Sequence, residues 1–302
     1  MWNNKLNIGN QYTLDDEFKK LARLHQSIYR ASILNVEFDE YGNRLREEDA
    51  RKLLNYYDRL NSRTVLRNRY PHYSKTRDAD MLRSEHIPFN IIAPLDTNKE
   101  LAITIIKDAF GIELSNICKI EMEFAPEPKY EYLNDGTSFD AYIEGCSWNN
   151  EIIGIGIEIK YTEKSYQIGK IEQANVTNHN SHYWTIARDS SVFIEPDNET
   201  FGSDELRQIW RNHLLGLAMR LRGKVIKFYS VTLFPSGNTH FVREIPRYKS
   251  FLKKDCDNVI GCTFEKFIDS IAGSEDFMHW KHWLWKRYII DNDRTGALLS
   301  SK

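Results

Sequence analysis

The sequence is poor in cysteine, has no long apolar run and carries almost no net charge. Its 302 residues include four cysteines, and no two of them form a CxxC pair, so a zinc ribbon is not expected. Four scattered thiols fit a reducing compartment, and we therefore expect a cytoplasmic protein. No run of about 18 apolar residues occurs, and the N-terminus has no apolar signal-peptide core, so neither a membrane span nor secretion is expected.

The charge is balanced over the whole chain but not along it. Lys and Arg number 41 and Asp and Glu number 43, a difference of −2, which excludes a uniformly basic protein of the histone kind. Binding to nucleic acid is not excluded, because charge can be local. Between Arg59 and Arg77, six basic residues occur without an acidic one. This segment predicts either an ordinary solvated face or a surface that contacts phosphate.

Residue spacing predicts helices at both ends of the chain and strands in its middle. Thr13 can cap a helix that begins at Asp15, and residues 165–200 read as an irregular polar segment. The other expected elements are helices over Glu47–Leu66 and Lys99–Phe110, strands over Ile117–Phe124, Thr137–Glu144 and Glu151–Thr162, a helix over Ser203–Arg222, a strand over Val225–Phe234, and helices over Phe264–Ala272 and Glu275–Ile290. The order in the middle predicts an α/β sandwich with a mixed sheet.

One expected strand carries charge on one side only. Its isoleucines at 153, 155, 157 and 159 share a face that we expect to be buried, whereas Glu158 and Lys160 share the other face with two glycines. Asp140 opens the preceding strand, and in an antiparallel hairpin the start of one strand lies beside the end of the next. We therefore expect Asp140 to lie close to Glu158 and Lys160.

Two carboxylates and a lysine that converge in this way can hold a hard divalent cation. The two acids repel each other, and Mg²⁺ would neutralise both while keeping water and phosphate oxygens as further ligands. Such a cation polarises a phosphoryl group, and Lys160 could orient or help deprotonate the attacking water, or stabilise the charge that grows on phosphorus. The competing interpretation is an ordinary cross-strand ion pair of Lys160 with Asp140 or Glu158 on a solvated face.

Four segments together resemble a known family. They are EHIPFN (residues 85–90), SFDAYIE (138–144), IEIKYTE (157–163) and RQIWRNHLL (207–215). They resemble the PD-(D/E)XK nuclease superfamily and, more narrowly, a group of bacterial restriction-type endonucleases within it. The resemblance covers about residues 85–235. It implies a restriction-endonuclease-like α-β-β-β-α-β core with a mixed central sheet flanked by helices, plus a helical N-terminal extension and C-terminal helices.

The resemblance also implies roles for individual residues. Asp140, Glu158 and Lys160 would match the motif, and the carbonyl of Ile159 would be a further metal ligand. An additional acid often comes from the preceding helical region, and Glu85 is the best match, although it could equally be a capping or surface carboxylate. Phe139 stands where the family's name has proline, which many members also lack. Mg²⁺, with Mn²⁺ as a substitute, is the implied cofactor.

The helix expected over residues 203–222 could hold the substrate. The helix and the residues after it contain no acid from Arg207 to Lys227. Gln208, Arg211 and Asn212 share one face of the helix. By resemblance Gln208 would point into the active site, and Arg207, Arg211 and Asn212 would contact nucleic acid. Alternatively, Arg211 pairs with a core carboxylate and Asn212 caps a buried backbone group.

The resulting interpretation is a helical extension over residues 1–80 and a nuclease domain over residues 81–302. The expected function is Mg²⁺-dependent hydrolysis of double-stranded DNA by a restriction-type enzyme. A homodimer and a cognate methyltransferase are the candidate partners. The alternatives are a structure-specific repair or mobile-element nuclease of the same fold, and a DNA-binding module that has lost activity.

Overall fold

The structure is a computed structural model that describes residues 6–254, 256 and 258–290. The chain divides into two compact units: Met1–Thr97 together with Ile271–Lys302, and Asn98–Ser270. We call them unit 1 and unit 2 and describe each by itself. Within the described residues, no helix is both long and apolar enough to cross a membrane.

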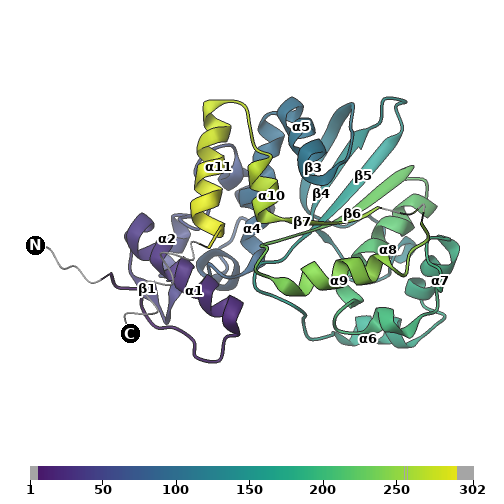
Figure 1. Ribbon diagram of the computed structural model, residues 1–302, viewed down its shortest axis with the longest axis horizontal. Helices are drawn as coiled ribbons and strands as arrows, with labels where there is room; N and C mark the ends of the chain where they lie inside the picture. The colour runs from purple at the N-terminus through teal and green to yellow at the C-terminus, as the bar shows by residue number, and fades with distance from the viewer. Residues whose placement is uncertain (1–5, 255, 257, 291–302) are drawn as a thin grey trace, which may run out of the picture. The chain divides into compact units, whose positions relative to one another are not determined.

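Unit 2 is built on a five-stranded mixed sheet (Figure 1). The strands follow one another in chain order across the sheet, which consists of β3 (Asn116–Phe124), β4 (Phe139–Cys146), β5 (Ile152–Ile159), β6 (Lys227–Phe234) and β7 (Val259–Thr263). The first three strands form an antiparallel meander, and β6 and β7 run parallel to β5. The predicted fold class and the order helix, three strands, helix, strand are thus confirmed.

Helices cover both faces of this sheet (Figure 1). One face carries α5 (Lys99–Phe110) and α10 (Phe264–Asp269), and the other carries α8 (Arg207–Leu221). The helices α7 (His182–Asp189) and α9 (Thr239–Lys249) pack against α8, and α6 (Lys170–Thr177) packs against α7. The prediction for α5 is confirmed at both ends, because Asn98 caps its first turn and Gly111 ends it in the left-handed conformation with φ of 72°.

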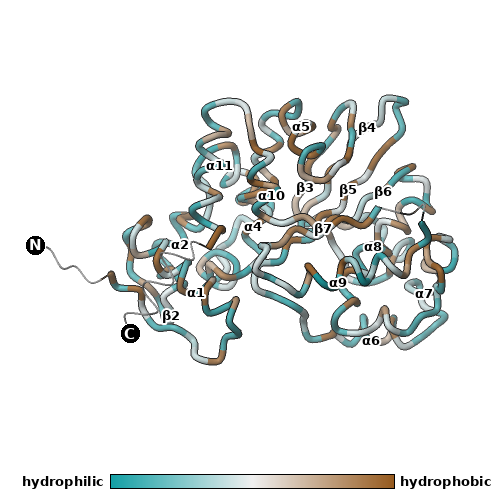
Figure 2. Tube along the Cα trace, viewed as in Figure 1, coloured by the Kyte–Doolittle hydropathy of each residue, from teal (hydrophilic) through white to brown (hydrophobic). Residues whose placement is uncertain are grey.

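The strand β5 is buried on both faces, not on one. Figure 2 shows hydrophobic residues concentrated along the central strands, and every residue from Ile153 to Ile159 is buried. The glycines of β5 make this possible on the α8 side, because a Cβ atom on Gly156 would lie 2.6 Å from the ring of Phe139. The charged end of the strand is therefore covered by a helix, and the interpretation of a solvated face is wrong.

Several other expectations for unit 2 are corrected. The segment 165–200 is not irregular throughout, because it contains α6 and α7. The strand β7 and the helix α9 were not predicted. The strand has only five residues and includes Gly261, and the helix contains Pro246, which normally argues against a helix interior.

Unit 1 is mainly helical. It contains α1 (Glu17–Tyr29), α2 (Glu47–Arg51), α3 (Ser62–Arg69), α4 (Ile87–Ile91) and α11 (Glu275–Tyr288), and a small hairpin of β1 (Phe38–Asp39) and β2 (Tyr41–Leu45). Short 3₁₀ and π turns connect these elements, at Arg30–Leu34, Lys75–Ala79, Ser84–His86 and Ala93–Thr97. A small core cluster is formed by Tyr29, Leu45, Ala50, Ala79 and Met81.

Two predictions for this unit are wrong in detail. The first helix is capped by Asp16, whose side chain accepts from the N–H of Lys19, and not by Thr13. The long helix over residues 47–66 is broken into α2 and α3, because Leu53, Leu60 and Asn61 have positive φ angles of 60°, 49° and 57°. The boundary expected at residue 80 also differs from the observed division, since residues 81–97 and α11 belong to unit 1.

Candidate active site

Asp140, Glu158 and Lys160 converge where β4 begins and β5 ends. The β4–β5 ladder stops at the pair Ala141 and Ile157, so Asp140 and Glu158 follow directly beyond the last bonded pair. Lys160 Nζ lies 2.7 Å from Glu158 Oε1. Asp140 Oδ2 accepts the main-chain N–H of Ile159 at 2.6 Å. The side chain of Asp140 thus takes the place of a strand-to-strand hydrogen bond.

The carbonyl of Ile159 points to the same side. The N–H of Lys160 donates to the carbonyl of Leu233 on β6 at 2.9 Å, so the main-chain groups of Lys160 face β6. Successive residues of a strand direct these groups to opposite neighbours, so those of Ile159 face β4. The carbonyl oxygen of Ile159 is therefore directed to the side on which Asp140 lies.

The site holds more negative than positive charge. Burial and the nearby carboxylate of Glu158 raise the pKa of Asp140 well above its usual value, and Lys160 offsets this only in part. Glu123 contributes in the same direction from β3, where the register places it opposite Asp140. Burial alone would lower the pKa of Lys160, but Glu158 and Asp140 outweigh it and raise that pKa above the usual value. The single ammonium group of Lys160 cannot neutralise all of these carboxylates, so the site favours the binding of a further cation.

Helix α8 fixes both oxygens of Glu158. Gln208 Nε2 donates to Oε1 at 2.5 Å, and Asn212 Nδ2 donates to Oε2 at 2.8 Å. The two amides are four residues apart and so lie on one face of the helix. The structure therefore brings Gln208 to the carboxylate site. Asn212 binds the Glu158 carboxylate and does not cap a backbone group.

Two arginines of α8, Arg207 and Arg211, bind a buried acid that was not predicted from the sequence. Glu172 on α6 accepts from Arg207 Nε and from Arg211 Nη1, each at 3.1 Å, and also from the hydroxyl of Tyr166. The side chain of Arg207 is only 3% exposed and that of Arg211 is 19% exposed. The alternative pairing of Arg211 with a buried carboxylate is thus the arrangement observed. The signal in the sequence is the absence of acids along α8, because buried arginines then need an acidic partner from another element.

A family comparison agrees with this geometry. The family model described as the PD-(D/E)XK nuclease superfamily matches residues 13–290. The chain belongs to the PD-(D/E)XK nuclease superfamily. Proteins of this superfamily are nucleases that generally use divalent metal ions, so nucleic acid is the substrate class. No curated protein matches the chain, and no solved structure matches it.

The oxygen donors of this candidate site fit a hard divalent cation. Asp140, Glu158 and the carbonyl of Ile159 supply carboxylate and carbonyl oxygens, which Mg²⁺ prefers. Among the residues that the structure describes, no group of three or more His, Cys, Asp and Glu side chains forms a ready metal cage. This is compatible with Mg²⁺, because that ion usually keeps several waters and binds one or two protein carboxylates.

Glu85 lies in unit 1, in the 3₁₀ turn Ser84–His86, and its side chain is exposed. Asp140, Glu158, Lys160 and Gln208 all belong to unit 2. The four side chains that converge at the ends of β4 and β5 therefore come from unit 2 alone.

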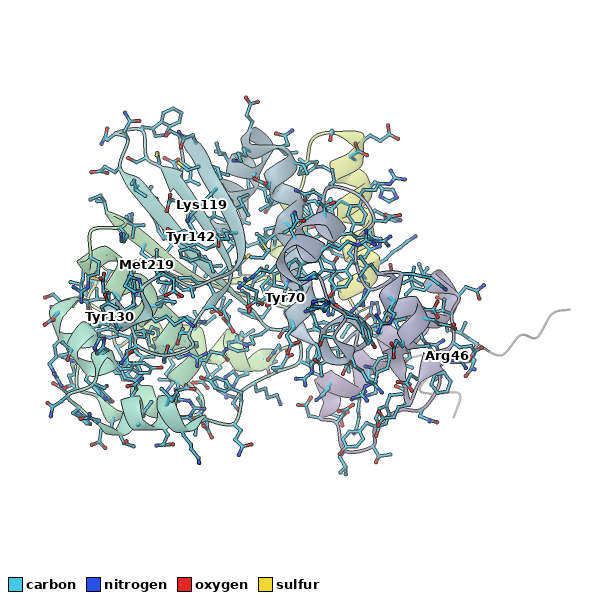
Figure 3. The ribbon with its side chains drawn as sticks, turned by 180° about the vertical axis from the view of Figure 1, so that it is seen from behind. Arg46, Tyr70, Lys119, Tyr130, Tyr142 and Met219 are labelled. Atoms are coloured by element: carbon cyan, nitrogen blue, oxygen red, sulfur yellow. The ribbon has the colours of Figure 1, made fainter. Side chains whose placement is uncertain are left out.

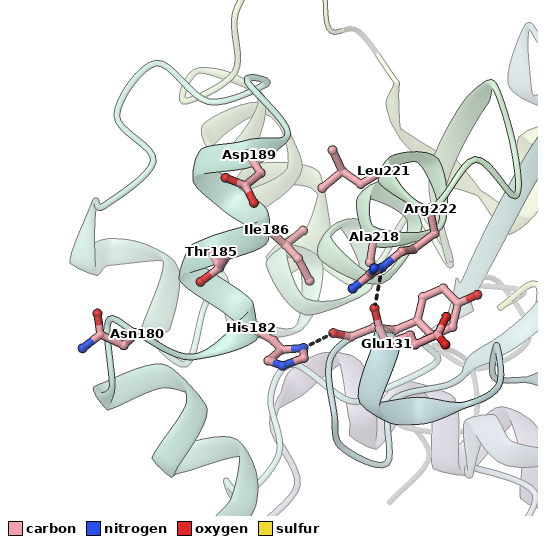
Figure 4. Close-up of a pocket in the computed structure, with 10 residues that line it drawn as sticks. Glu131, Asn180, His182, Thr185, Ile186, Asp189, Ala218, Leu221 and Arg222 are labelled. Atoms are coloured by element: carbon pink, nitrogen blue, oxygen red, sulfur yellow. Dashed lines mark hydrogen bonds between the residues drawn. The ribbon is translucent and has the colours of Figure 1, made fainter.

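A pocket of about 520 Å³ lies elsewhere in unit 2, between α7 and the C-terminal part of α8 (Figure 4). His182 Nδ1 is 2.5 Å from the carbonyl oxygen of Tyr132, and Arg222 Nε donates to the carbonyl oxygen of Glu131 at 3.0 Å. Ala218 is the lining residue of α8 nearest in the chain to Asn212 and lies six residues from it, or about 9 Å along the helix axis, and no lining residue belongs to the carboxylate site. The pocket is thus separate from the carboxylate site.

Proposed function

We propose that this protein is a Mg²⁺-dependent DNA endonuclease of the restriction type. The observation that carries the proposal is the convergence of Asp140, Glu158 and Lys160, with Gln208 and Asn212 bonded to the two oxygens of Glu158. Such a preorganised set of charges is what hydrolysis of a phosphodiester requires. The restriction role rests on the resemblance of four short segments to that group of enzymes.

Asp140, Glu158 and the Ile159 carbonyl would hold Mg²⁺, or Mn²⁺ in its place, and the cation would supply Lewis-acid polarisation of the scissile phosphate. Lys160 keeps its proton on Nζ, because Glu158 and Asp140 raise its pKa. It therefore donates hydrogen bonds to the attacking water or to phosphate oxygens. A water oxygen bonds to phosphorus in line while the phosphorus–oxygen bond to the leaving strand breaks, the water's proton passes to solvent, and the leaving oxygen takes up a proton from solvent.

The other predicted residues take different parts in this proposal. Gln208 and Asn212 hold the orientation of Glu158. Arg207 binds Glu172, which also binds Arg211, and so helps to position Arg211. Arg211 keeps partial exposure and is therefore the predicted contact that could reach a phosphate. Glu85 is proposed as an additional metal ligand on the resemblance alone. A homodimer would provide one site for each DNA strand, and a cognate methyltransferase would protect the host's own sites.

The test is cleavage of unmethylated plasmid and phage DNA with Mg²⁺ or Mn²⁺. Wild type is compared with Asp140→Ala and Lys160→Ala, and the matched controls are Asp108→Ala and Lys107→Ala, which change exposed residues of α5. We expect discrete fragments from wild type and both controls, and none from the two site variants.

The other outcomes separate the alternatives. Smeared products that are lost in both site variants would keep the nuclease and reject the restriction role. Cutting restricted to flaps or ends would support a structure-specific nuclease. Undiminished cleavage by Asp140→Ala and Lys160→Ala would reject this active site. Salt-sensitive DNA binding without cleavage in either metal would support the inactive DNA-binding module.

A further inference from the structure

Unit 1 contains a small basic pocket between α2, α3 and the segment that follows α3. Its volume is about 130 Å³. Its lining residues come from the acid-free stretch between Arg59 and Arg77, from Asp78 directly after it, and from α2 and the residues that follow α2. The charged and aromatic members are Arg51, Arg67, Tyr70, His72, Tyr73, Arg77 and Asp78.

The single acid of the pocket is already satisfied. Asp78 accepts both Nε and Nη2 of Arg77 at 2.8 Å, the Tyr56 hydroxyl at 2.6 Å and the N–H of Ser74 at 2.7 Å. Asp78 and Arg77 therefore cancel one another. Arg51 is paired with Glu47, which does not line the pocket, at 2.6 Å. Two arginines thus remain in the lining without an acid of the pocket to balance them.

Arg67 is the donor that the fold leaves available. It is exposed, and no hydrogen bond or ion pair joins it to another residue in the described part of the chain. The hydroxyl of Tyr73 and the ring of His72 likewise have no hydrogen-bond partner among the described residues. The guanidinium groups of Arg77 and Arg51 lie over the rings of Tyr70 and Tyr73, at 4.3 Å and 4.6 Å. These contacts hold Arg51 and Arg77 in the wall of the pocket, and Arg67, His72 and Tyr73 add unpartnered polar groups to its lining.

We propose that this pocket binds a single backbone phosphate of the nucleic acid on which the enzyme acts. A phosphate group has five heavy atoms, and a cavity of about 130 Å³ holds such a group but not a whole nucleotide. A guanidinium group presents paired donors that match phosphate oxygens, and a hydroxyl and an imidazole can complete the contact. The choice of nucleic acid over free phosphate rests on the proposed function.

The experiment measures binding of a fluorescein-labelled DNA duplex to the full chain by anisotropy, over a range of salt concentrations. An Asp140→Asn background prevents cleavage during the measurement. Arg67→Ala removes the free donor of the pocket. Arg46→Ala is the matched control, because Arg46 is an exposed arginine of the same unit, outside the pocket, and lies apart from Tyr70 in the view of Figure 3. Thermal unfolding confirms that both variants are folded.

We expect Arg67→Ala to weaken binding about tenfold or more at low salt, as the loss of a hydrogen bond to a charged group does. The slope of log affinity against log salt should fall by about 0.9, the value for one phosphate contact. Arg46→Ala should change neither quantity more than about twofold. Equal effects of the two variants would overturn the proposal.

Two further arms separate the sources of phosphate and the two proposals. Inorganic phosphate should compete with the duplex more strongly than chloride at matched ionic strength, and only when Arg67 is present. Binding of inorganic phosphate at Arg67 without any effect on the duplex would reject the nucleic-acid ligand. If wild type cuts no DNA but Arg67 still governs DNA binding, the proposed catalysis fails and the pocket stands. If wild type cuts DNA and Arg67 has no effect on binding, the reverse holds.

Discussion

The carboxylate of Asp140 accepts the main-chain N–H of Ile159 at 2.6 Å, just beyond the point where the ladder between β4 and β5 ends. This hydrogen bond ties one expected metal ligand to the residue whose carbonyl is another. The main chain of β5 thus fixes Asp140 without the use of a further side chain. The geometry is in place before any cation binds, so a cation has only to neutralise the repulsion between Asp140 and Glu158.

The first prediction concerns that repulsion. Replacing Asp140 with Asn keeps an oxygen for the N–H of Ile159 and removes one of the two opposed charges. We expect Asp140→Asn to raise the unfolding temperature of the metal-free protein and to abolish cleavage. Mg²⁺ should stabilise the wild type, by about 2.7 kcal/mol at a hundred times its dissociation constant, and should stabilise the variant much less. Differential scanning calorimetry with and without Mg²⁺ measures both effects.

Asp108→Asn serves as the control, because it changes an exposed aspartate on α5. It should respond to Mg²⁺ as the wild type does. An Asp140→Asn protein that gains as much stability from Mg²⁺ as the wild type would show that Asp140 is not a ligand.

The second prediction concerns the amides that hold Glu158. Asn212→Ala removes the amide that donates to Oε2 of the buried Glu158 carboxylate. Gln208→Ala removes one of the two donors at Oε1, where Lys160 is the other. Loss of a hydrogen bond to a buried charge costs about 1.5–3 kcal/mol, so each variant should lose about tenfold or more in cleavage rate. The expected loss is larger for Asn212→Ala, because Lys160 still contacts Oε1 when Gln208 is removed.

Rates of cleavage at saturating DNA measure this effect, and Gln173→Ala on the exposed side of α6 is the control. If Asn212→Ala cuts DNA at the rate of the control, then the contact between α8 and Glu158 has no part in the reaction.

The central part of the fold could be predicted because its signals are local. Alternating isoleucines and two glycines mark β5, and Asn98 and Gly111 mark the ends of α5. The hairpin rule then places Asp140 beside Glu158, and helical spacing places Gln208 and Asn212 on one face. Each of these inferences uses residues fewer than about twenty positions apart within regular elements, where backbone geometry fixes direction.

The parts that could not be predicted depend on contacts between distant segments. Glu172 and Arg211 are 39 residues apart, and nothing in the local sequence of α6 indicates that its acid is buried against α8. The break between α2 and α3 depends on positive φ angles at Leu60 and Leu53, residues that do not favour that conformation. Tertiary packing overrides local preference at these positions, which spacing rules do not detect.

The third prediction concerns stability in acid. His213 on α8 is fully buried, its Nδ1 lies 3.0 Å from the hydroxyl of Tyr248, and burial and then Arg220 lower its pKa to about 3. An unfolded histidine binds a proton near pH 6.5, so between about pH 6.5 and about pH 3 the unfolded state binds more protons. The contribution of His213 to the free energy of unfolding should therefore fall with falling pH in this window, by about 2 kcal/mol between pH 7 and pH 5.

Urea unfolding at several pH values measures this dependence. His213→Gln should be less stable at pH 7 and should show a flatter pH dependence below pH 6.5. His179→Gln alters an exposed histidine of unit 2 and serves as the control for the substitution itself. A His213→Gln curve that keeps the full wild-type slope would mean that His213 does not contribute to the acid sensitivity.

The fourth prediction concerns the packing of α8 against the sheet. Gly216 faces β6 so closely that a Cβ atom there would lie 1.9 Å from Cε1 of Phe228. Gly216→Ala must therefore move the helix or the ring, and overpacking of this kind costs about 1–3 kcal/mol. Because the same helix carries Gln208 and Asn212, its displacement should also reduce cleavage at temperatures where the protein is folded.

Gly136→Ala is the control, since nothing lies within 4 Å of its added Cβ atom. The double variant Gly216→Ala with Phe228→Leu relieves the clash and should recover part of both the stability and the cleavage rate. If the double variant is simply as unstable as the sum of the two single changes, then contact between Gly216 and Phe228 does not set the position of the helix.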